Sequence, residues 1–276
     1  MALIYNATFD KNTRKLAFKD KAGNEIYSCT IPERTPAVDD INKPLTFKAT
    51  QDGSTVTLTK YGDPYGAFQT SRNGGRTWTD YTIGTSITLN NGGEVSFRAK
   101  FDRTIGQRDD KYFRFNMTGK IEAWHNVRSM HRTNDFATYD NIMGAYAYYG
   151  MFRNCTSLTK APILPDTLLN QDEYTYMFSG CTSLVKAPEL RVTSLTPYCF
   201  SSMFYNCSSL KEVSCYIPPE YSEHDIFNAT NGPNSDKYPW LYGVSSTGTF
   251  YTNADAHWPS GASGIPKEWN RVNAYT

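Results

Sequence analysis

The chain has 276 residues, with 28 Lys and Arg against 27 Asp and Glu and a formal net charge of +1. This balance gives no overall electrostatic attraction to nucleic acid or to an anionic membrane surface, so neither is an expected partner. Aromatic residues make up 14% of the chain and charged residues only 20%, which is typical of folded protein and unlike disordered segments.

Residues 1–35 are predicted to form a separate N-terminal β module, because three strand-like runs lie between residues 3 and 31. Pro32 and Pro36 follow these runs, and proline stiffens a linker and limits helix formation. We therefore assign 36–43 as a linker between the N-terminal module and the rest of the chain.

The N-terminal segment MALIYNATFDKNTRK has neither the basic region nor the apolar region of a signal peptide. No run approaches the roughly 18 to 20 consecutive apolar residues that a membrane span needs. The sequence therefore predicts a protein that is made in a cytoplasm, is not exported by the general secretory route and has no membrane span.

Residues 44–104 are predicted to form a small antiparallel β-sandwich of the immunoglobulin-like kind, since four runs of alternating apolar and polar residues are separated by Gly and Asn clusters. Within this region SRNGGRTW, residues 71–78, resembles the Asp-box hairpin of sialidase-type propellers, with Asn in place of Asp. A propeller needs several copies and only one is present. We interpret the motif as a folding device and expect Trp78 in the core.

Three segments in the C-terminal half repeat at a spacing of 26 residues: MFRNCTSL at 151–158, MFSGCTSL at 177–184 and MFYNCSSL at 203–210. This period lies within the roughly 20 to 29 residues of leucine-rich repeats. Inside each unit the apolar residues follow helix-like spacing, and a short strand is expected after them. The sequence therefore predicts a short stack of coils.

The repeated apolar positions are expected to form the core of this stack. They are Met151, Phe152, Cys155, Leu158, Met177, Phe178, Cys181, Leu184, Met203, Phe204, Cys207 and Leu210. The chain contains no Cys-x-x-Cys pair and no His at zinc-ligand spacing from a cysteine. We interpret the cysteines as small buried packing residues and expect no metal and no cofactor.

The motif M-F-x-x-C-x-S-L followed by x-x-A-P-x-L, at this period, closely resembles the BspA-like leucine-rich repeats of Bacteroidetes surface proteins and of virion proteins from their phages, crAss-like phages included. Residues 242–269 resemble the segment that ends such arrays, and FNMTGK at 115–120 resembles the strand that opens them. The resemblance covers about residues 110–276 and implies a leucine-rich-repeat solenoid with caps, which we assign to 105–276. The expected fold class is mainly β with short helices.

No catalytic constellation is visible in the sequence. His125 and His131 do not form a His-Glu-x-x-His motif, and the other two histidines lie in unrelated settings. We interpret these histidines as surface or capping residues and the acidic pairs as solvated, and we expect no enzyme activity. An enzyme on a repeat scaffold is kept as a third alternative, after the two functions that are given at the end of this section.

The aromatic residues outside the repeat register are candidates for a binding surface, because aromatic side chains dominate binding hot spots. The candidates are Tyr139, Tyr146, Tyr149, Tyr221, Tyr238 and Trp240.

The resemblance implies a bacteriophage virion structural protein, a head or tail fibre or a decoration subunit. Such a subunit would dock to other virion proteins through residues 1–35 and present its repeat domain to a host-surface glycan or protein. Fibres of this kind are homo-oligomers, and a trimer is one common form. The alternative is a bacterial cell-surface adhesin or glycan-binding protein.

Overall fold

The computed structural model describes residues 6–10, 15–30, 41–102, 107–139, 144–231 and 239–273. The fold is mainly β, with several sheets and short helices. The chain divides into two compact units, Met1–Val38 and Asp39–Thr276, and each unit is described by itself.

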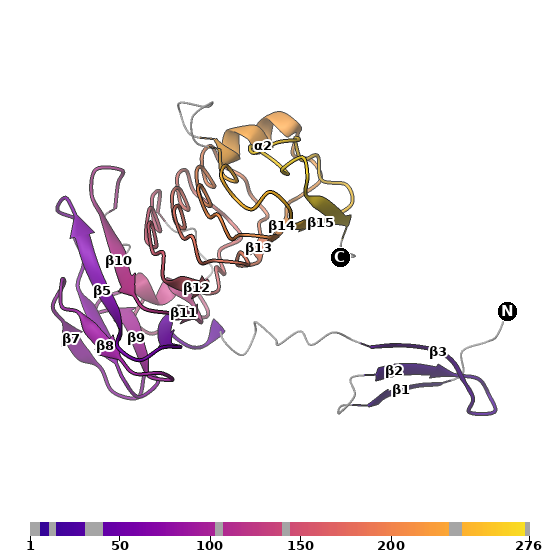
Figure 1. Cartoon of the computed structure of the whole chain (residues 1–276), viewed down its shortest axis with the longest axis horizontal. Helices are drawn as coiled ribbons and strands as arrows, with labels where there is room; N and C mark the ends of the chain where they lie inside the picture. Colours follow the sequence, from indigo (N-terminus) through magenta and orange to yellow (C-terminus); the bar gives the residue numbers. More distant parts are fainter. Residues whose placement is uncertain are drawn as a thin grey trace. The chain divides into compact units, whose positions relative to one another are not determined.

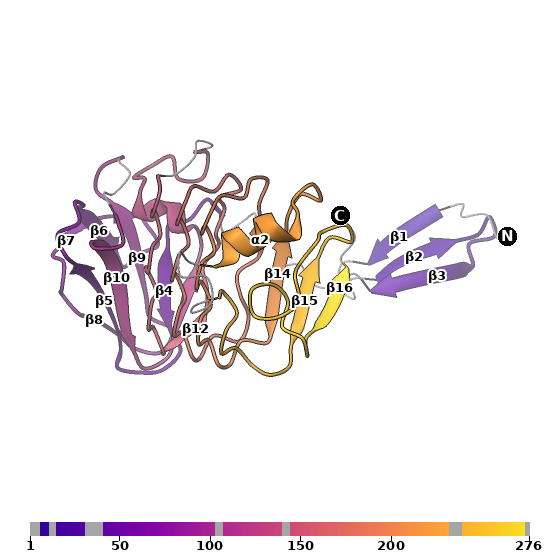
Figure 2. The same cartoon turned by 90° about the horizontal axis from the view of Figure 1, so that it is seen from above.

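The first unit is a three-stranded antiparallel sheet (Figure 2), with β1 (Asn6–Asp10), β2 (Lys15–Lys19) and β3 (Glu25–Thr30) in that order. The turn between β2 and β3 is built on Asp20, whose carboxylate accepts hydrogen bonds from the backbone N–H groups of Ala22 and Asn24, both at 2.9 Å. An Asp side chain that bonds to the backbone two residues ahead favours such a turn.

The second unit begins with two sheets that pack face to face. Their strand orders are β10-β5-β8 and β12-β11-β4-β9-β6-β7, and all neighbours are antiparallel except β11 and β12. The strands are β4 (Thr46–Ala49), β5 (Ser54–Tyr61), β6 (Phe68–Ser71), β7 (Thr79–Tyr81), β8 (Ile87–Leu89), β9 (Glu94–Ala99), β10 (Tyr112–Thr118), β11 (Ile121–Trp124) and β12 (Leu158–Lys160).

Aromatic rings join the two sheets. The ring of Phe115 on β10 lies 4.6 Å from that of Phe47 on β4 and 5.2 Å from that of Phe97 on β9, measured between centroids. All three side chains are completely buried. Alternation along the strands therefore places one face of each sheet in a shared core.

The strands at 112–124 are hydrogen-bonded into these sheets, although the sequence boundary at 104 places them in the repeat domain. Tyr112 on β10 is paired with Tyr61, and Ile121 on β11 is paired with Ala49. Ile121 also pairs in parallel with Leu158 on β12, in the first coil. The segment thus belongs to the sheets and to the stack at once, because β11 has a paired strand on each side and the N–H of Phe115 on β10 donates to the carbonyl of Met151 at 2.8 Å.

The three repeats lie in successive coils that are joined by backbone hydrogen bonds (Figure 1). The N–H of Phe152 donates to the carbonyl of Met177, and the N–H of Phe178 donates to that of Met203, both at 2.9 Å. Backbone N–H groups of one coil are thus paired with carbonyl groups of the next coil.

The helix-like spacing within each repeat does not correspond to a helix. The segments are chains of tight turns, in which a residue with positive φ recurs at every fourth position, as at Tyr146, Gly150 and Asn154. Left-handed residues interrupt an α-helix. The helices lie elsewhere: a 3-10 turn at η1 (Val127–Met130) and α2 (Glu223–Thr230).

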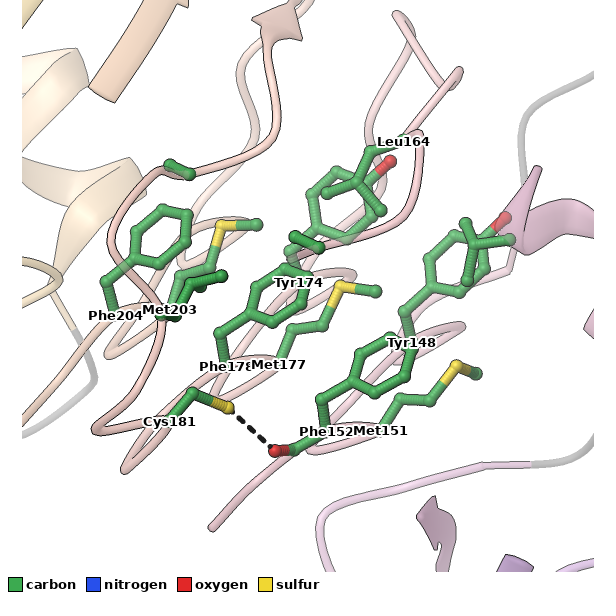
Figure 3. Close-up of a cluster of buried hydrophobic side chains, with 14 of the residues drawn as sticks. Tyr148, Met151, Phe152, Leu164, Tyr174, Met177, Phe178, Cys181, Met203 and Phe204 are labelled. Carbon is green, nitrogen blue, oxygen red and sulfur yellow. Dashed lines mark hydrogen bonds between the residues drawn. The ribbon is translucent and has the colours of Figure 1, made fainter. Parts of the chain in front are cut away.

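A column of parallel phenylalanine rings forms the centre of the stack (Figure 3). The centroids of Phe152 and Phe178 are 5.3 Å apart and those of Phe178 and Phe204 are 5.7 Å apart, with 4° between the ring planes in both pairs. The column continues to Phe115 at one end and to Trp240 at the other. All twelve repeat positions are completely buried, so the core runs without interruption from the sheets through the coils.

The repeated cysteines also serve as hydrogen-bond donors. The thiols of Cys155, Cys181 and Cys207 donate to the carbonyl oxygens of Phe115, Phe152 and Phe178, at 3.0, 3.1 and 3.0 Å. Burial raises the pKa of Cys155 to about 12, so its thiol stays protonated and remains a donor. Each cysteine therefore ties its own coil to the preceding segment.

A parallel sheet begins within the coils and extends toward the C-terminal end (Figure 2). Its order is β13 (Leu190–Arg191), β14 (Glu212–Tyr216), β15 (Thr249–Thr252) and β16 (Asn270–Asn273). Trp240 and Trp258 stack at 5.3 Å and cover the end of the phenylalanine column. This end of the stack is therefore closed by large aromatic side chains.

Trp78 does not lie in the core, so that expectation is wrong. The hairpin is held by polar bonds, in which Ser71 Oγ accepts from the N–H of Gly75 at 2.9 Å and Asn73 Oδ1 accepts from the N–H of Thr77 at 3.0 Å. These bonds direct the Trp78 ring to the surface. There it is half-buried beneath the Arg98 guanidinium, 4.3 Å from the ring centroid.

Candidate binding groove

Two of the six aromatic residues predicted as a binding surface are buried. Trp240 is completely buried and Tyr149 is only 7% exposed. Trp240 closes the ring column, and Tyr149 packs between Tyr112 and Tyr176. Tyr238 lies outside the described residues.

The other three candidates are half-buried and lie in separate places. The Arg132 guanidinium covers the ring of Tyr139 at 4.3 Å. The hydroxyl of Tyr221 accepts a hydrogen bond from the N–H of Leu195 at 3.0 Å. Tyr146 lies at the edge of the first coil, 5.7 Å from the ring of Tyr149.

The structure shows a groove on the edge of the coils, with a cavity volume of about 260 Å³. Its lining residues are Arg153, Asn154, Tyr176, Ser179, Gly180, Tyr205 and Asn206. Six of them belong to two adjacent positions of the 26-residue repeat: 153, 179 and 205 form one set, and 154, 180 and 206 form the other. The repeat therefore places the members of each set side by side in successive coils.

Gly180 lies on the floor of the groove, between two asparagines. Asn154 and Asn206 occupy the same register position in the coils on either side, and all three residues have positive φ. A Cβ at position 180 would clash with Oδ1 of Asn154. The Asn154 side chain therefore lies over the glycine, and a glycine at 180 is what allows this amide to lie there.

Aromatic side chains form the two walls of the groove. On one side, the Arg153 guanidinium lies 4.5 Å from the centroid of the Tyr176 ring. On the other side, the rings of Tyr205 and Tyr242 stack at 5.4 Å, with 14° between their planes. Tyr242 is 52% exposed, so this wall presents a ring to solvent.

The row of rings continues beyond Tyr176 toward the sheets. The centroids of Tyr149 and Tyr112 are 5.1 Å apart, and those of Tyr112 and Tyr61 are 5.3 Å apart. Tyr61 is 60% exposed. The row therefore joins the groove to β5 through two rings, those of Tyr149 and Tyr112, that are buried.

The lining of the groove consists of hydrogen-bonding side chains and tyrosine rings. Amide, hydroxyl and guanidinium groups can donate hydrogen bonds, and the tyrosine rings can cover an apolar face. Among the groove's described lining residues there is no carboxylate, histidine or cysteine. In the described ranges as a whole, no three His, Cys, Asp or Glu side chains are placed to hold a metal ion.

A second polar cluster is enclosed within the first coils. The Arg128 guanidinium pairs with Asp166, and the Tyr148 hydroxyl donates to the same carboxylate at 2.7 Å. Burial raises the pKa of Glu173 well above its usual value, although one of its oxygens accepts from the N–H of Asn170 at 2.7 Å. All of these side chains are buried, so the cluster is structural and closed to a ligand.

His131 is also completely buried, which corrects its interpretation as a surface or capping residue. Its ring lies edge-on to Tyr148 at 4.9 Å, and Nε2 is 2.8 Å from the carbonyl oxygen of Ala147. Burial lowers the pKa of His131 to about 3. The imidazole is therefore neutral at neutral pH.

No protein-family model, no curated protein and no solved structure matches this chain. No helix in the described ranges combines the length and apolar character that crossing a membrane requires.

Proposed function

We propose that this chain is a structural protein of a bacteriophage particle, a head or tail fibre or a decoration subunit. It docks to other virion proteins through residues 1–35 and presents the remainder to a host-surface glycan or protein. In this proposal the two packed sheets are an immunoglobulin-like sandwich, and the coils are a short BspA-like leucine-rich-repeat solenoid. The subunit acts in the virion as a homo-oligomer, with no enzyme activity.

The observation that carries this proposal is the division of the chain into two very unequal compact units, Met1–Val38 and Asp39–Thr276. Units below about 40 residues rarely bury enough apolar surface to be stable without disulfides, metal or association. The first unit is a three-stranded sheet in which Ile26 is 37% exposed. Such a sheet gains stability by packing on a partner surface, as a docking module does.

The second unit supports a display role. Its core is continuous from the sheets to the tryptophans at the end of the coils, so it needs no partner to complete it. Its coil edges present the groove and the exposed ring of Tyr242. A rigid body with a surface groove, attached to a small module that needs a partner, suits a subunit that is anchored at one end and binds at the other.

The test is incorporation into particles of the phage whose genome encodes the chain. Deletion of residues 1–35 is expected to give a folded protein, with the same urea midpoint for the second unit, that is missing from purified particles. A control with residues 1–35 intact and Gly180→Asn in the groove should be incorporated normally. Normal incorporation of the truncated chain would overturn the docking assignment.

Electron microscopy of whole particles gives a second readout of the same proposal. Density for the chain on the head or tail is expected, and it would also give the copy number. If immunogold labelling places the chain on a bacterial cell surface and particles lack it, the adhesin alternative replaces the virion proposal.

A further inference from the structure

We infer that the groove between Tyr176 and Tyr205 binds an acidic glycan, with Arg153 facing the carboxylate or other anionic group of the sugar. This inference deepens the proposed function and rests on its host-surface role. It assigns both a place and a chemical class to the ligand.

The charge of the groove favours an anion. Arg153 is the one charged residue among the described lining residues, and its side chain makes no ion pair or hydrogen bond within the described ranges. Its guanidinium is stacked on Tyr176, which covers a face and leaves the N–H donors around the edge. A guanidinium held in this way suits bidentate binding of a carboxylate.

The two asparagines supply hydrogen bonds for hydroxyl groups. The backbone N–H of Asn154 donates to the carbonyl of Ser179, and that of Asn206 donates to the carbonyl of Tyr242, both at 2.7 Å. These bonds and the positive φ angles fix the backbone from which both side-chain amides extend. Each amide carries two donors and an acceptor, which is the pairing that a polyhydroxylated ring requires.

The aromatic wall supplies a surface for the apolar face of a sugar ring. Tyr205 is held against Tyr242 by stacking at 5.4 Å, so binding costs little side-chain entropy. Tyrosine combines a flat apolar face with a polar hydroxyl. A sugar ring has the same combination, with C–H groups on its faces and hydroxyls on its rim.

The size of the groove argues against a protein partner at this place. Its volume of about 260 Å³ is at or below the roughly 300 Å³ at which small-molecule sites begin. A protein interface buries about 800 Å² on each partner and has an apolar centre. The lining here combines polar groups with tyrosine rings, and the groove has room for one or two sugar units.

The experiment measures binding of the purified full chain to an array of oligosaccharides. The array holds hexuronic, sialic, pyruvylated and sulfated sugars, each with its neutral counterpart, and affinities of the bound members are measured by calorimetry. We expect at least one acidic member to bind at least tenfold more tightly than its neutral counterpart. Absence of binding to any acidic member, or equal affinity for both forms, would overturn the inference.

Three variants locate the site. Arg153→Gln should remove the preference for the acidic form. Gly180→Asn places the residue of the neighbouring coils at 180, where its Cβ would displace the Asn154 amide, and should reduce affinity for both forms at least tenfold. Arg191→Gln is the matched control, because Arg191 covers the ring of Tyr216 at 4.6 Å outside the groove. An unchanged preference in Arg153→Gln would contradict the inference even if the chain binds glycans.

These outcomes are separate from those of the incorporation test. The array uses purified chain, so acidic-glycan binding by a chain that is missing from particles leaves the groove assignment standing and removes the virion proposal. Incorporation without glycan binding does the reverse. Thermal unfolding of each variant near the wild-type temperature shows that lost binding does not come from lost folding.

Discussion

Replacement of Phe178 by alanine should destabilise the whole second unit. The Phe178 side chain is completely buried, and parallel rings cover both of its faces, at 5.3 and 5.7 Å. Buried Phe→Ala changes cost about 3 to 5 kcal/mol, and the cost is larger where the site cannot collapse. The backbone bonds between coils hold the neighbouring rings apart, and each ring pair contributes about 0.5 to 1.5 kcal/mol. We therefore expect a loss of about 5 kcal/mol.

Equilibrium unfolding in urea measures this loss with two probes. Tryptophan fluorescence reports mainly on the C-terminal end, and far-ultraviolet circular dichroism reports on all of the sheets. Because the core is continuous, both probes should shift together in one transition. Phe178→Leu keeps most of the volume and should cost about 1 to 2 kcal/mol, while exposed Val185→Ala should change stability by less than about 0.5 kcal/mol.

Two results would refute the reasoning. A loss below about 1 kcal/mol for Phe178→Ala would mean that the rings are not packed as described. A shift in the fluorescence transition alone would mean that the sheets fold independently of the coils.

Three further predictions concern buried titratable groups. The thiols of Cys155 and Cys207, whose pKa values burial raises to about 12, should resist iodoacetamide at pH 8 for hours and react only in urea; rapid labelling of native protein contradicts a buried column. Glu173→Gln should gain stability relative to wild type as pH rises above about 4.5, because the raised pKa of Glu173 makes its ionisation costly in the folded state; a difference that is constant between pH 4 and 8 would count against this. Between pH 6.5 and pH 3 the unfolded imidazole of His131 binds a proton that the folded one, with a pKa of about 3, does not, so the free energy of unfolding falls as pH falls. His131→Asn should reduce the slope of unfolding free energy against pH in this range. Equal slopes in the variant and the wild type would show that another group is responsible.

The exact 26-residue spacing made the core of the coils predictable. A frame of Met, Phe, Cys and Leu that recurs at one period specifies which side chains stack, and all twelve are buried. The local conformation was not predictable from spacing alone, because helix-like periodicity also fits a chain of turns. Only the backbone angles at Tyr146, Gly150 and Asn154 show that left-handed residues interrupt any helix.

The binding surface was harder to predict than the core. Aromatic residues outside the repeat register looked available, but Trp240 closes the ring column and Tyr149 packs between neighbouring coils. The groove instead lies around Gly180, where the absence of a side chain lets the Asn154 amide lie over the backbone of the next coil. The sequence contains this signal as the change from Asn to Gly at one register position, but its meaning requires knowing that this position faces solvent.

The cysteine thiols that bond to a phenylalanine carbonyl in the preceding coil make every joint of the stack chemically alike. A chain built from identical joints can change its length by whole units of 26 residues, since an inserted coil would find the same ring, the same carbonyl and the same backbone partners on both sides. Each inserted coil would add exposed edge positions, equivalent to Asn154 and Thr156 of the first repeat, whose residues are not constrained by the core. The reach and the chemistry of the outer edge can therefore vary through duplication and single substitutions, while the two ends of the stack remain unchanged.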